Sequence, residues 1–329
     1  MAGQQAAERP RLGMYWAAGC GGCEIAVLEI HEHLLDLMDA VQIAFWPCVA
    51  DFKYEHVRSM PDGAMDVCLF NGAIRNEENR EMACLLRAKS KVFVAFGACA
   101  CHGGIPGLAN LHRREAVLKR CFSTESTDNP GGALPQKRTD LDGMVLTLPE
   151  LLPRVRALGQ EVEVDWFVPG CPPTETHVRA VLDALQSGPL PGAGTRVFAG
   201  NRSVCDECPL PKRNGRTAGF VRPHQVVARG DRCLLEEGIV CLGPATRSGC
   251  EARCPRVNMP CRGCYGPAGD SPDQGAKMIG LLGSLLQSEK EEEIRAQMDG
   301  IVDPAGTFYR FTLPTSTLKS ARLGQGRTP

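Results

Sequence analysis

Two cysteines separated by two glycines stand near the start of the chain, at Cys20-Gly21-Gly22-Cys23. The apolar run at residues 13–18 before them predicts a buried strand, and the pattern at 24–38 after them predicts an amphipathic helix. The cysteines therefore lie on a turn that leads into a helix N-terminus, where backbone N–H groups and the helix dipole stabilise anions and thiolates. Nucleotide-binding folds place a glycine-rich phosphate turn here. Cysteines in that position indicate a soft metal centre instead.

Two further cysteines follow predicted strands elsewhere in the chain. Cys99 comes three residues after the apolar run at 91–96, and Cys171 comes three residues after the run at 162–168. Because the carboxyl ends of parallel strands share one edge of a sheet, we expect these two to converge with the first pair. Four thiolates in one place suit a Cys₄ iron–sulfur cluster. The expected set is Cys20, Cys23, Cys99 and Cys171.

The other cysteines of the first half are expected not to be ligands. Cys68 and Cys84 lie inside core-like runs, where a cysteine usually acts as a small buried hydrophobe. Cys48 and Cys121 are also interpreted as non-ligands. Cys101 is the nearest rival to Cys99, because only one residue separates them.

Eight more cysteines fall between positions 205 and 264, and none follows them. They are Cys205, Cys208, Cys233, Cys241, Cys250, Cys254, Cys261 and Cys264. Proline after Cys208 and Cys254 is typical of bacterial ferredoxins, and eight thiolates are enough for two four-iron clusters. Two Cys₄ zinc sites are the alternative, since such sites also use C-x₂-C pairs. Iron is favoured because the first-half cysteines lack a compact zinc spacing.

The composition limits the class of protein. A hydrophobic content of 43% over 329 residues supports a real core, and a net charge of −1 gives no case for binding nucleic acid or a membrane surface. No segment approaches eighteen uncharged apolar residues, so we expect no membrane span. The N-terminus lacks an apolar signal core and a twin-arginine motif, which predicts a cytoplasmic protein. In that compartment the 17 cysteines are better explained by metal ligation than by disulfides.

Strand-like and helix-like runs alternate through the first half, which predicts a flavodoxin-like, doubly wound parallel α/β sheet. Strands are expected at 13–18, 41–46, 65–70, 91–96 and 162–168, and helices at 24–38, 77–88, 148–158 (broken near Pro153), 174–186 and 273–286. Residues 122–142 predict a surface insertion. The expected parts are an α/β domain at 1–190, a linker at 191–204, a small loop-rich ferredoxin-like module at 205–270, and a helical and extended tail at 271–329.

Four other features of the sequence lead to further expectations. Glu24 either orients a cluster or carries protons, or is simply a first-turn glutamate that the helix dipole favours. His102 is expected on a solvent-facing loop. The charged run at 289–293 predicts a solvated helix face. The aromatic patch at 308–311 is expected to pack on the cysteine module, with a subunit contact as the alternative.

Taken together, these motifs resemble the small, electron-transferring subunit of nickel–iron hydrogenases over about residues 10–270. The motifs are C-x₂-C at Cys20/Cys23, Gly-x-Cys-Ala at 97–100, Pro-Gly-Cys-Pro-Pro at 169–173, and the 24 residues between Cys208 and Cys233. A subunit of respiratory complex I shares the first three motifs. It lacks the second cysteine module, so its resemblance ends near residue 190.

Two departures resemble the cytoplasmic group of these hydrogenases, which carries three four-iron clusters. Cys205 stands where the membrane-linked enzymes use a histidine, and four cysteines stand where their medial cluster uses three. The motifs at 261–267, 273–277 and 306–311 are most similar to the methyl-viologen-reducing type, which passes electrons to a heterodisulfide reductase. The deazaflavin-reducing type is a close alternative.

The resemblance implies an electron relay with no catalytic residue of its own. A partner large subunit would hold the nickel–iron centre and oxidise hydrogen, and electrons would leave through a small iron–sulfur adaptor subunit to a heterodisulfide reductase-type flavoprotein. It also implies a proximal cluster on Cys20, Cys23, Cys99 and Cys171, a medial cluster on Cys250, Cys254, Cys261 and Cys264, and a distal cluster on Cys205, Cys208, Cys233 and Cys241. A quinone-reducing, complex-I-like subunit and a structural zinc protein are the rival functions.

Overall fold

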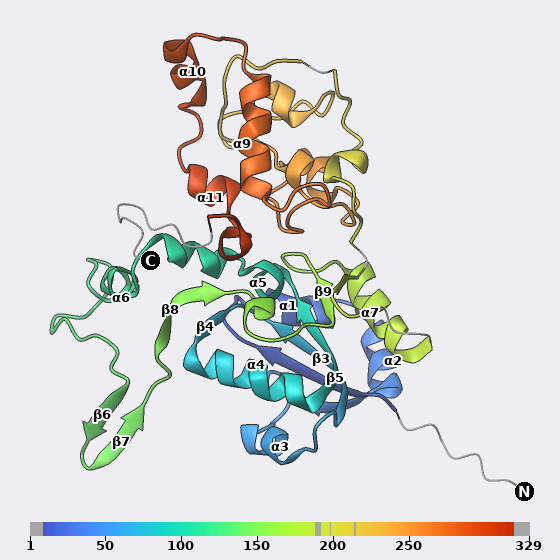
Figure 1. Cartoon of the computed structure of the whole chain (residues 1–329), viewed down its shortest axis with the longest axis vertical. Coiled ribbons are helices and arrows are strands. Elements are labelled where there is room, and N and C mark those ends of the chain that lie inside the picture. The colour runs from blue at the N-terminus through green and yellow to red at the C-terminus, as the bar shows by residue number, and fades with distance from the viewer. Residues whose placement is uncertain (1–8, 188–191, 198, 214, 319–329) are drawn as a thin grey trace, which may run out of the picture.

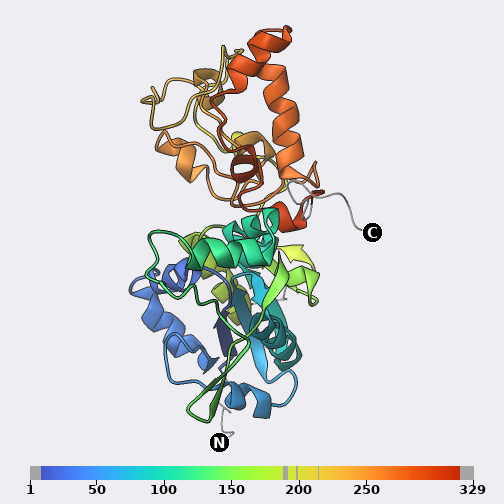
Figure 2. The same ribbon diagram turned by 90° about the vertical axis from the view of Figure 1, so that its left-hand side faces the viewer.

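The computed structural model describes residues 9–187, 192–197, 199–213 and 215–318. An α/β body holds the N-terminal half of the chain, and a second body built largely from loops sits beyond one end of its sheet (Figures 1 and 2). Within the described residues, no helix has both the length and the apolar character needed to cross a membrane.

The α/β body is built on a six-stranded parallel sheet in the order β10-β9-β5-β3-β1-β2. Its strands are β1 (Arg11–Trp16), β2 (Gln42–Phe45), β3 (Met65–Asn71), β5 (Ser90–Phe96), β9 (Trp166–Val168) and β10 (Thr195–Arg196). Alternate side chains of the central strands enter two separate apolar cores, one on each face. The predicted doubly wound α/β fold is confirmed.

Helices cover both faces of this sheet (Figure 1). On one face pack α1 (Gly22–Leu28), α2 (His33–Ala40) and α7 (Glu175–Ser187), and on the other α3 (Tyr54–Ser59) and α4 (Glu77–Lys89). Two short helical segments, α5 (Ala98–His102) and η1 (Ile105–Leu111), follow β5 directly. The helices predicted at 77–88 and 174–186 are therefore confirmed.

Some sequence-based boundaries are wrong. The helix predicted at 24–38 is two helices, because His31 adopts a positive φ of 56° that interrupts the α-helical path. The helix predicted at 148–158 is instead strand β8 (Leu151–Arg156), which pairs antiparallel with β4 (Ile74–Asn76). Pro153 cannot donate a helix hydrogen bond but is tolerated in a short edge strand. The expected linker at 191–204 contributes the edge strand β10.

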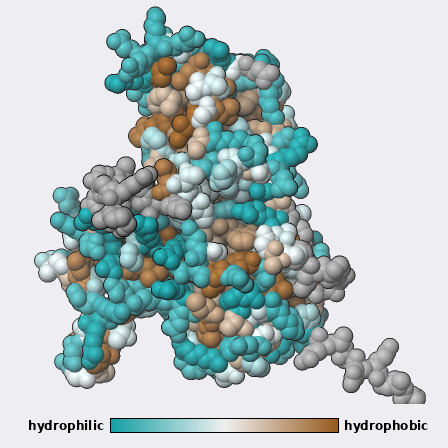
Figure 3. Space-filling view, in the orientation of Figure 1, coloured by the Kyte–Doolittle hydropathy of each residue, from teal (hydrophilic) through white to brown (hydrophobic). Residues whose placement is uncertain are grey.

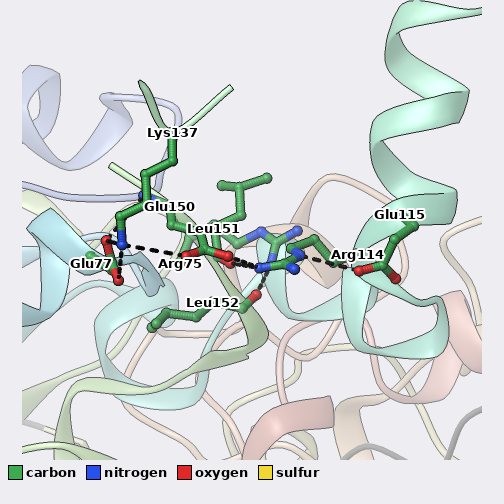
Figure 4. A network of polar contacts seen from close by, with 8 residues as sticks. All are labelled: Arg75, Glu77, Arg114, Glu115, Lys137, Glu150, Leu151 and Leu152. Carbon is green, nitrogen blue, oxygen red and sulfur yellow. Dashed lines mark hydrogen bonds and ion pairs between the residues drawn. The ribbon is translucent and has the colours of Figure 1, made fainter. Parts of the chain in front are cut away.

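The predicted insertion begins after α6 (Arg114–Phe122) and includes a hairpin of β6 (Arg138–Leu141) and β7 (Met144–Thr147). The hairpin projects away from the body (Figure 1), and every residue of its two strands is exposed. Hydrophobic residues show at its surface in Figure 3. At its base, Lys137 pairs with Glu77 at 3.0 Å, and Arg114 pairs with Glu150 (Figure 4). These ion pairs tie the insertion to the body.

The second body has little regular structure around its cysteines. It contains the short segments η3 (Val204–Asp206), η4 (Leu234–Glu237), η5 (Gly243–Ala245) and α8 (Arg253–Arg256), followed by α9 (Gln274–Leu285), α10 (Glu291–Met298), α11 (Pro304–Phe308) and η6 (Leu313–Thr315). Phe308, Tyr309 and Phe311 are buried, and the first two join the apolar core of this body. The packing of the aromatic patch on the cysteine module is therefore confirmed. The glutamates that open α10 are solvated, as predicted.

Candidate functional site

The first four candidate cysteines lie at the carboxyl ends of three strands of the sheet. Cys20 and Cys23 occupy the turn after β1 and the first turn of α1, where Gly21 adopts a left-handed φ of 80°. Cys99 lies in α5 directly after β5, and Cys171 follows β9. The parallel strand order puts these three ends on one edge, as the sequence predicts.

Three of these four thiols, here called the proximal quartet, have pKa values raised by burial and by charges from within the set, as is expected of sulfurs that lie close together. Burial raises the pKa of the Cys23 thiol above its usual range, and negative charge on Cys99, Cys171 and Cys20 raises it further. Burial and the charges of Cys171 and Cys20 likewise raise the pKa of Cys99 to about 12. Cys20 and Cys171 are exposed, whereas the other two are half-buried, so the quartet opens to the surface on one side.

Two glycines leave room beside these sulfurs. At position 97, where φ is 89°, an added Cβ would lie 2.4 Å from the Cys23 sulfur. At position 104 an added Cβ would lie 2.4 Å from the Cys99 sulfur. Only glycine allows the backbone to approach the thiols this closely. The space and the four soft donors fit a bound iron–sulfur cluster, while ligation itself stays a prediction.

The remaining first-half cysteines are placed differently from this quartet. Cys101 is buried, and its sulfur donates to the Ala95 carbonyl oxygen at 3.2 Å. Cys68 is fully buried, as predicted. The prediction that Cys84 is buried is wrong, because α4 turns Ala83 and Leu86 to the core and leaves Cys84 exposed. Cys48 and Cys121 are also exposed.

A second quartet gathers at Cys205, Cys208, Cys233 and Cys241, here called the distal quartet. All four line one small cavity, together with apolar side chains such as Val204 and Leu234. Burial raises the pKa of Cys205 to about 12, and the charges of the other three thiols contribute. Gly243 lies against the set, since an added Cβ there would be 3.2 Å from the Cys205 sulfur. The four soft donors therefore suit the same kind of group as the first site.

The last four cysteines, here called the medial quartet, also interact with cysteines outside their own set. They are Cys250, Cys254, Cys261 and Cys264. Burial raises the pKa of Cys264 to about 12, and Cys250 and Cys254 are among the charges that add to it. Cys261 interacts first with Cys241 of the distal quartet and then with Cys264. Its backbone N–H also donates to the Cys241 sulfur at 3.2 Å. Cys261 thus lies between the two sets, and the division of these eight cysteines stays a prediction.

The three quartets follow one another without interruption. The charge and the backbone of Cys171 both affect the pKa of the Cys264 thiol, so the proximal and medial quartets are neighbours. Next to Cys264, the Tyr265 hydroxyl lies 2.8 Å from Nδ1 of His177 on α7. Cys261 then links the medial and distal quartets. The two bodies of the chain are therefore joined where their cysteines meet.

His102 belongs to this junction, which contradicts its expected place on a solvent-facing loop. It is buried on α5, and its Nε2 has no hydrogen-bond partner in the part of the chain that the structure describes. Burial, and then the positive charge of Arg196, lowers the pKa of His102 to about 3. The side chain is packed so closely that a Cβ at Gly266 would lie 2.3 Å from its Nε2. The sequence carries no sign of this burial, because the covering residues come from the second body.

Glu24 is buried behind the proximal quartet. Its carboxylate accepts hydrogen bonds from Asn71 Nδ2 at 2.7 Å and from Trp46 Nε1. Burial raises the pKa of Glu24, although both hydrogen bonds oppose that rise. A first-turn glutamate held only by the helix dipole would not need these partners. Asn71 and Trp46 carry no local signal in the sequence, because they come from other segments of the sheet.

These quartets would each hold a cluster of several irons, which differs from a site for a single metal ion. Among the residues that the structure describes, no group of three or more His, Cys, Asp or Glu side chains has the arrangement to hold one such ion.

Comparisons with known proteins agree on one family. A family model described as NADH ubiquinone oxidoreductase, 20 Kd subunit, matches residues 20–185. The chain is 40% identical over 311 residues to the iron-sulfur subunit of the F420-non-reducing hydrogenase of Archaeoglobus profundus, covering 92% of this chain and 96% of that protein. It is 37% identical to the corresponding F420-non-reducing hydrogenase subunit of Methanothermobacter marburgensis, covering 98% and 100%. A [NiFeSe]-hydrogenase structure from Dm. baculatum has the same fold, with a TM-score of 0.50, 20% identity, and coverage of 81% of this chain and 97% of that one.

Proposed function

The chain belongs to the family of iron–sulfur subunits of F420-non-reducing hydrogenases, and from this premise we propose that it relays electrons between a hydrogen-oxidising large subunit and a heterodisulfide reductase-type acceptor. It is a subunit of an oxidoreductase, and hydrogen is activated on the partner large subunit. Beyond the family membership, we propose that the chain holds three four-iron clusters and is cytoplasmic. We also propose that its electrons pass through an adaptor subunit to the acceptor.

The observation that carries the proposal is the unbroken series of cysteine quartets. Cys171 affects the pKa of Cys264, and the Cys261 N–H donates to the Cys241 sulfur, which supports a series in which no quartet is isolated from the next. When bound, iron–sulfur clusters supply reversible one-electron exchange. All-cysteine sites favour low potentials, which suits a low-potential acceptor.

The chain's own residues position and shield these sites. Strand ends hold the proximal quartet, and Gly97 and Gly104 keep its sulfurs unobstructed. Exposed apolar side chains at Trp16, Ile25 and Ile105 lie on the segments that carry the exposed side of this quartet. Such side chains favour burial against another protein. The large subunit is the partner we propose for this face.

The rival functions have less support. A complex-I-like subunit would account for the family match at residues 20–185, yet the relatives of the full chain extend over the second body as well. A deazaflavin-reducing hydrogenase would use the same relay and differ only in its acceptor. The names of the similar hydrogenases describe them as F420-non-reducing, which favours the other type.

Metal analysis of the complex isolated with its large subunit tests the relay. We expect about twelve irons and about twelve acid-labile sulfides per copy of this chain, with nickel in the large subunit. Cys171→Ser should abolish hydrogen-dependent reduction of the protein acceptor, while Cys121→Ser, at an exposed cysteine outside the quartets, should preserve it. Stoichiometric zinc with negligible iron would overturn the proposal.

A further inference from the structure

A cavity of about 440 Å³ in the second body is lined by four basic side chains. They are Arg222, His224, Arg262 and Arg310, and we call this cavity the arginine pocket. Its other walls are mainly apolar, with Val240, Leu242, Met259 and Ile301 among them. Apolar walls around a few convergent charged groups are typical of binding sites.

The positive charge of the arginine pocket is not neutralised from within. Arg222, His224 and Arg262 make no side-chain hydrogen bond or ion pair anywhere in the part of the chain that the structure describes. Asp303 is the one acidic residue of the lining, and it caps α11 by accepting from the Gly306 N–H at 2.9 Å.

Arg310 shows the effect of this excess charge. Its Nε donates to the Gly306 carbonyl oxygen at 3.1 Å, which holds the guanidinium at the cavity. Burial, and then the positive charge of Arg262, lowers the pKa of Arg310, and Asp303 only partly offsets them. Two guanidinium groups that repel each other in a partly desolvated site are stabilised by a bound anion.

The arginine pocket lies directly beside two cysteine quartets. Leu242 in its wall follows Cys241, and its N–H donates to the Cys261 carbonyl oxygen at 3.0 Å. Arg262 follows Cys261. A group bound in this cavity is therefore separated by a single residue from a distal-quartet cysteine and from a medial-quartet cysteine.

The basic surface extends beyond this cavity. Val221 lines both the arginine pocket and a second, adjoining cavity that contains Arg216, Arg229 and Arg232 together with Glu236 and Glu237. These two glutamates accept hydrogen bonds from the backbone N–H groups of Arg213 and Arg229. Val227 lies in the second cavity and is 93% exposed. Basic groups and exposed apolar groups therefore run along a surface that is longer than one small anion needs.

We propose that the arginine pocket and this adjoining cavity dock an acidic segment of the protein that accepts the electrons, with its carboxylates on Arg222 and Arg262. This inference rests on the proposed relay function. Arginine binds carboxylates in a bidentate manner, and complementary charge speeds and orients association. The docked protein would lie beside the medial and distal quartets, where electrons would leave the chain.

The test compares Arg222→Gln and the double variant Arg222→Gln/Arg262→Gln with Arg295→Gln, which removes an exposed arginine of α10 outside both cavities. Each is assayed in the isolated hydrogenase complex for iron content, for hydrogen-dependent reduction of benzyl viologen, and for reduction of the purified protein acceptor. The double variant should raise the KM for the protein acceptor on the order of tenfold, with Arg222→Gln intermediate. Iron content and viologen reduction should stay at wild-type levels.

Salt provides a second readout of the same contact. Added NaCl should raise the KM of the wild type and of Arg295→Gln, and should affect the double variant less, because fewer charges remain to be screened. An unchanged KM and an unchanged salt response in the double variant would overturn the docking assignment. So would tight binding of free citrate that the double variant loses while its acceptor KM stays unchanged, since the cavity would then serve a small anion. Failure of the wild-type complex to reduce viologen with hydrogen would instead contradict the relay function.

Discussion

The two bodies of this chain hold their cysteines in opposite ways. In the α/β body, four cysteines distant in sequence are brought together by strand ends of a sheet with apolar cores on both faces. In the second body, eight cysteines fall within residues 205–264, on loops and short turns with little regular structure between them. The first quartet is therefore placed by the fold, whereas the other two quartets form part of the interior that holds their body together.

This difference predicts different responses to cluster loss. A sheet with its own cores remains stable when one ligand is removed from its edge, because its hydrophobic burial is unchanged. A body whose interior includes metal sites couples metal binding to folding, as small metallo-domains do. Cys261 interacts with both the medial and the distal quartet. We therefore expect the loss of one of these two quartets to disturb the other.

The largest expected effect comes from comparing Cys241→Ser with Cys171→Ser. Cys241→Ser should destabilise the second body by several kcal/mol, so that residues 205–318 become sensitive to limited proteolysis and more than one cluster's iron is lost. Cys171→Ser should lose about four irons and leave the protease pattern unchanged. Iron analysis and proteolysis of both variants provide the comparison. Equal protease resistance in the two variants would remove the distinction between the bodies.

A smaller, local effect is expected from Gly97→Ala. The new Cβ would lie 2.4 Å from the Cys23 sulfur, in a backbone conformation that alanine rarely adopts, so the proximal quartet should lose its iron selectively. The matched control is Gly131→Ala in the insertion, where nothing lies within 4 Å of the added Cβ. We expect about eight irons per chain in the first variant and about twelve in the control. Full iron occupancy in Gly97→Ala would contradict the placement of Cys23 beside the bound group.

The smallest effect concerns the junction between the two bodies. The pKa of His102 is about 3 in the folded chain, well below the ordinary value of 6.5. Below pH 6.5 the unfolded chain takes up a proton that the folded chain does not, so stability should fall by up to about 1.4 kcal/mol per pH unit toward pH 3. Above pH 6.5 this group should have no effect.

Urea unfolding between pH 5.5 and 8 measures this dependence. His102→Gln should flatten the acid side of the stability curve, although its midpoint at pH 8 should be lower because the close packing of this side chain against Gly266 is altered. His112→Gln, at an exposed histidine, serves as the control and should keep the wild-type slope. A wild-type slope in His102→Gln would show that this histidine does not titrate as its burial implies.

The prominent local signals of the sequence were reliable. Continuous apolar runs predicted the central strands, and the glycine-flanked cysteines predicted which strand ends carry thiols. The projecting hairpin could also have been predicted, since Asp142-Gly143 between Leu141 and Met144 is typical of a tight hairpin turn. The turn does have the required positive φ values, 52° and 80°. These features depend on neighbours in the chain, so the sequence alone carries them.

Tertiary structure decided what depends on distant contacts. Pairing with β4 made residues 151–156 a strand, and the second body buried His102. Asn71 and Trp46 supplied the partners of Glu24, and the fold placed Cys261 between two quartets and brought Arg222, Arg262 and Arg310 into one cavity. None of these features has a local period or motif, because each is stabilised by groups far away in the chain. The sequence by itself determined that one set of four thiols and a group of eight were present and on which segments, and the tertiary structure decided which of these thiols lie next to one another.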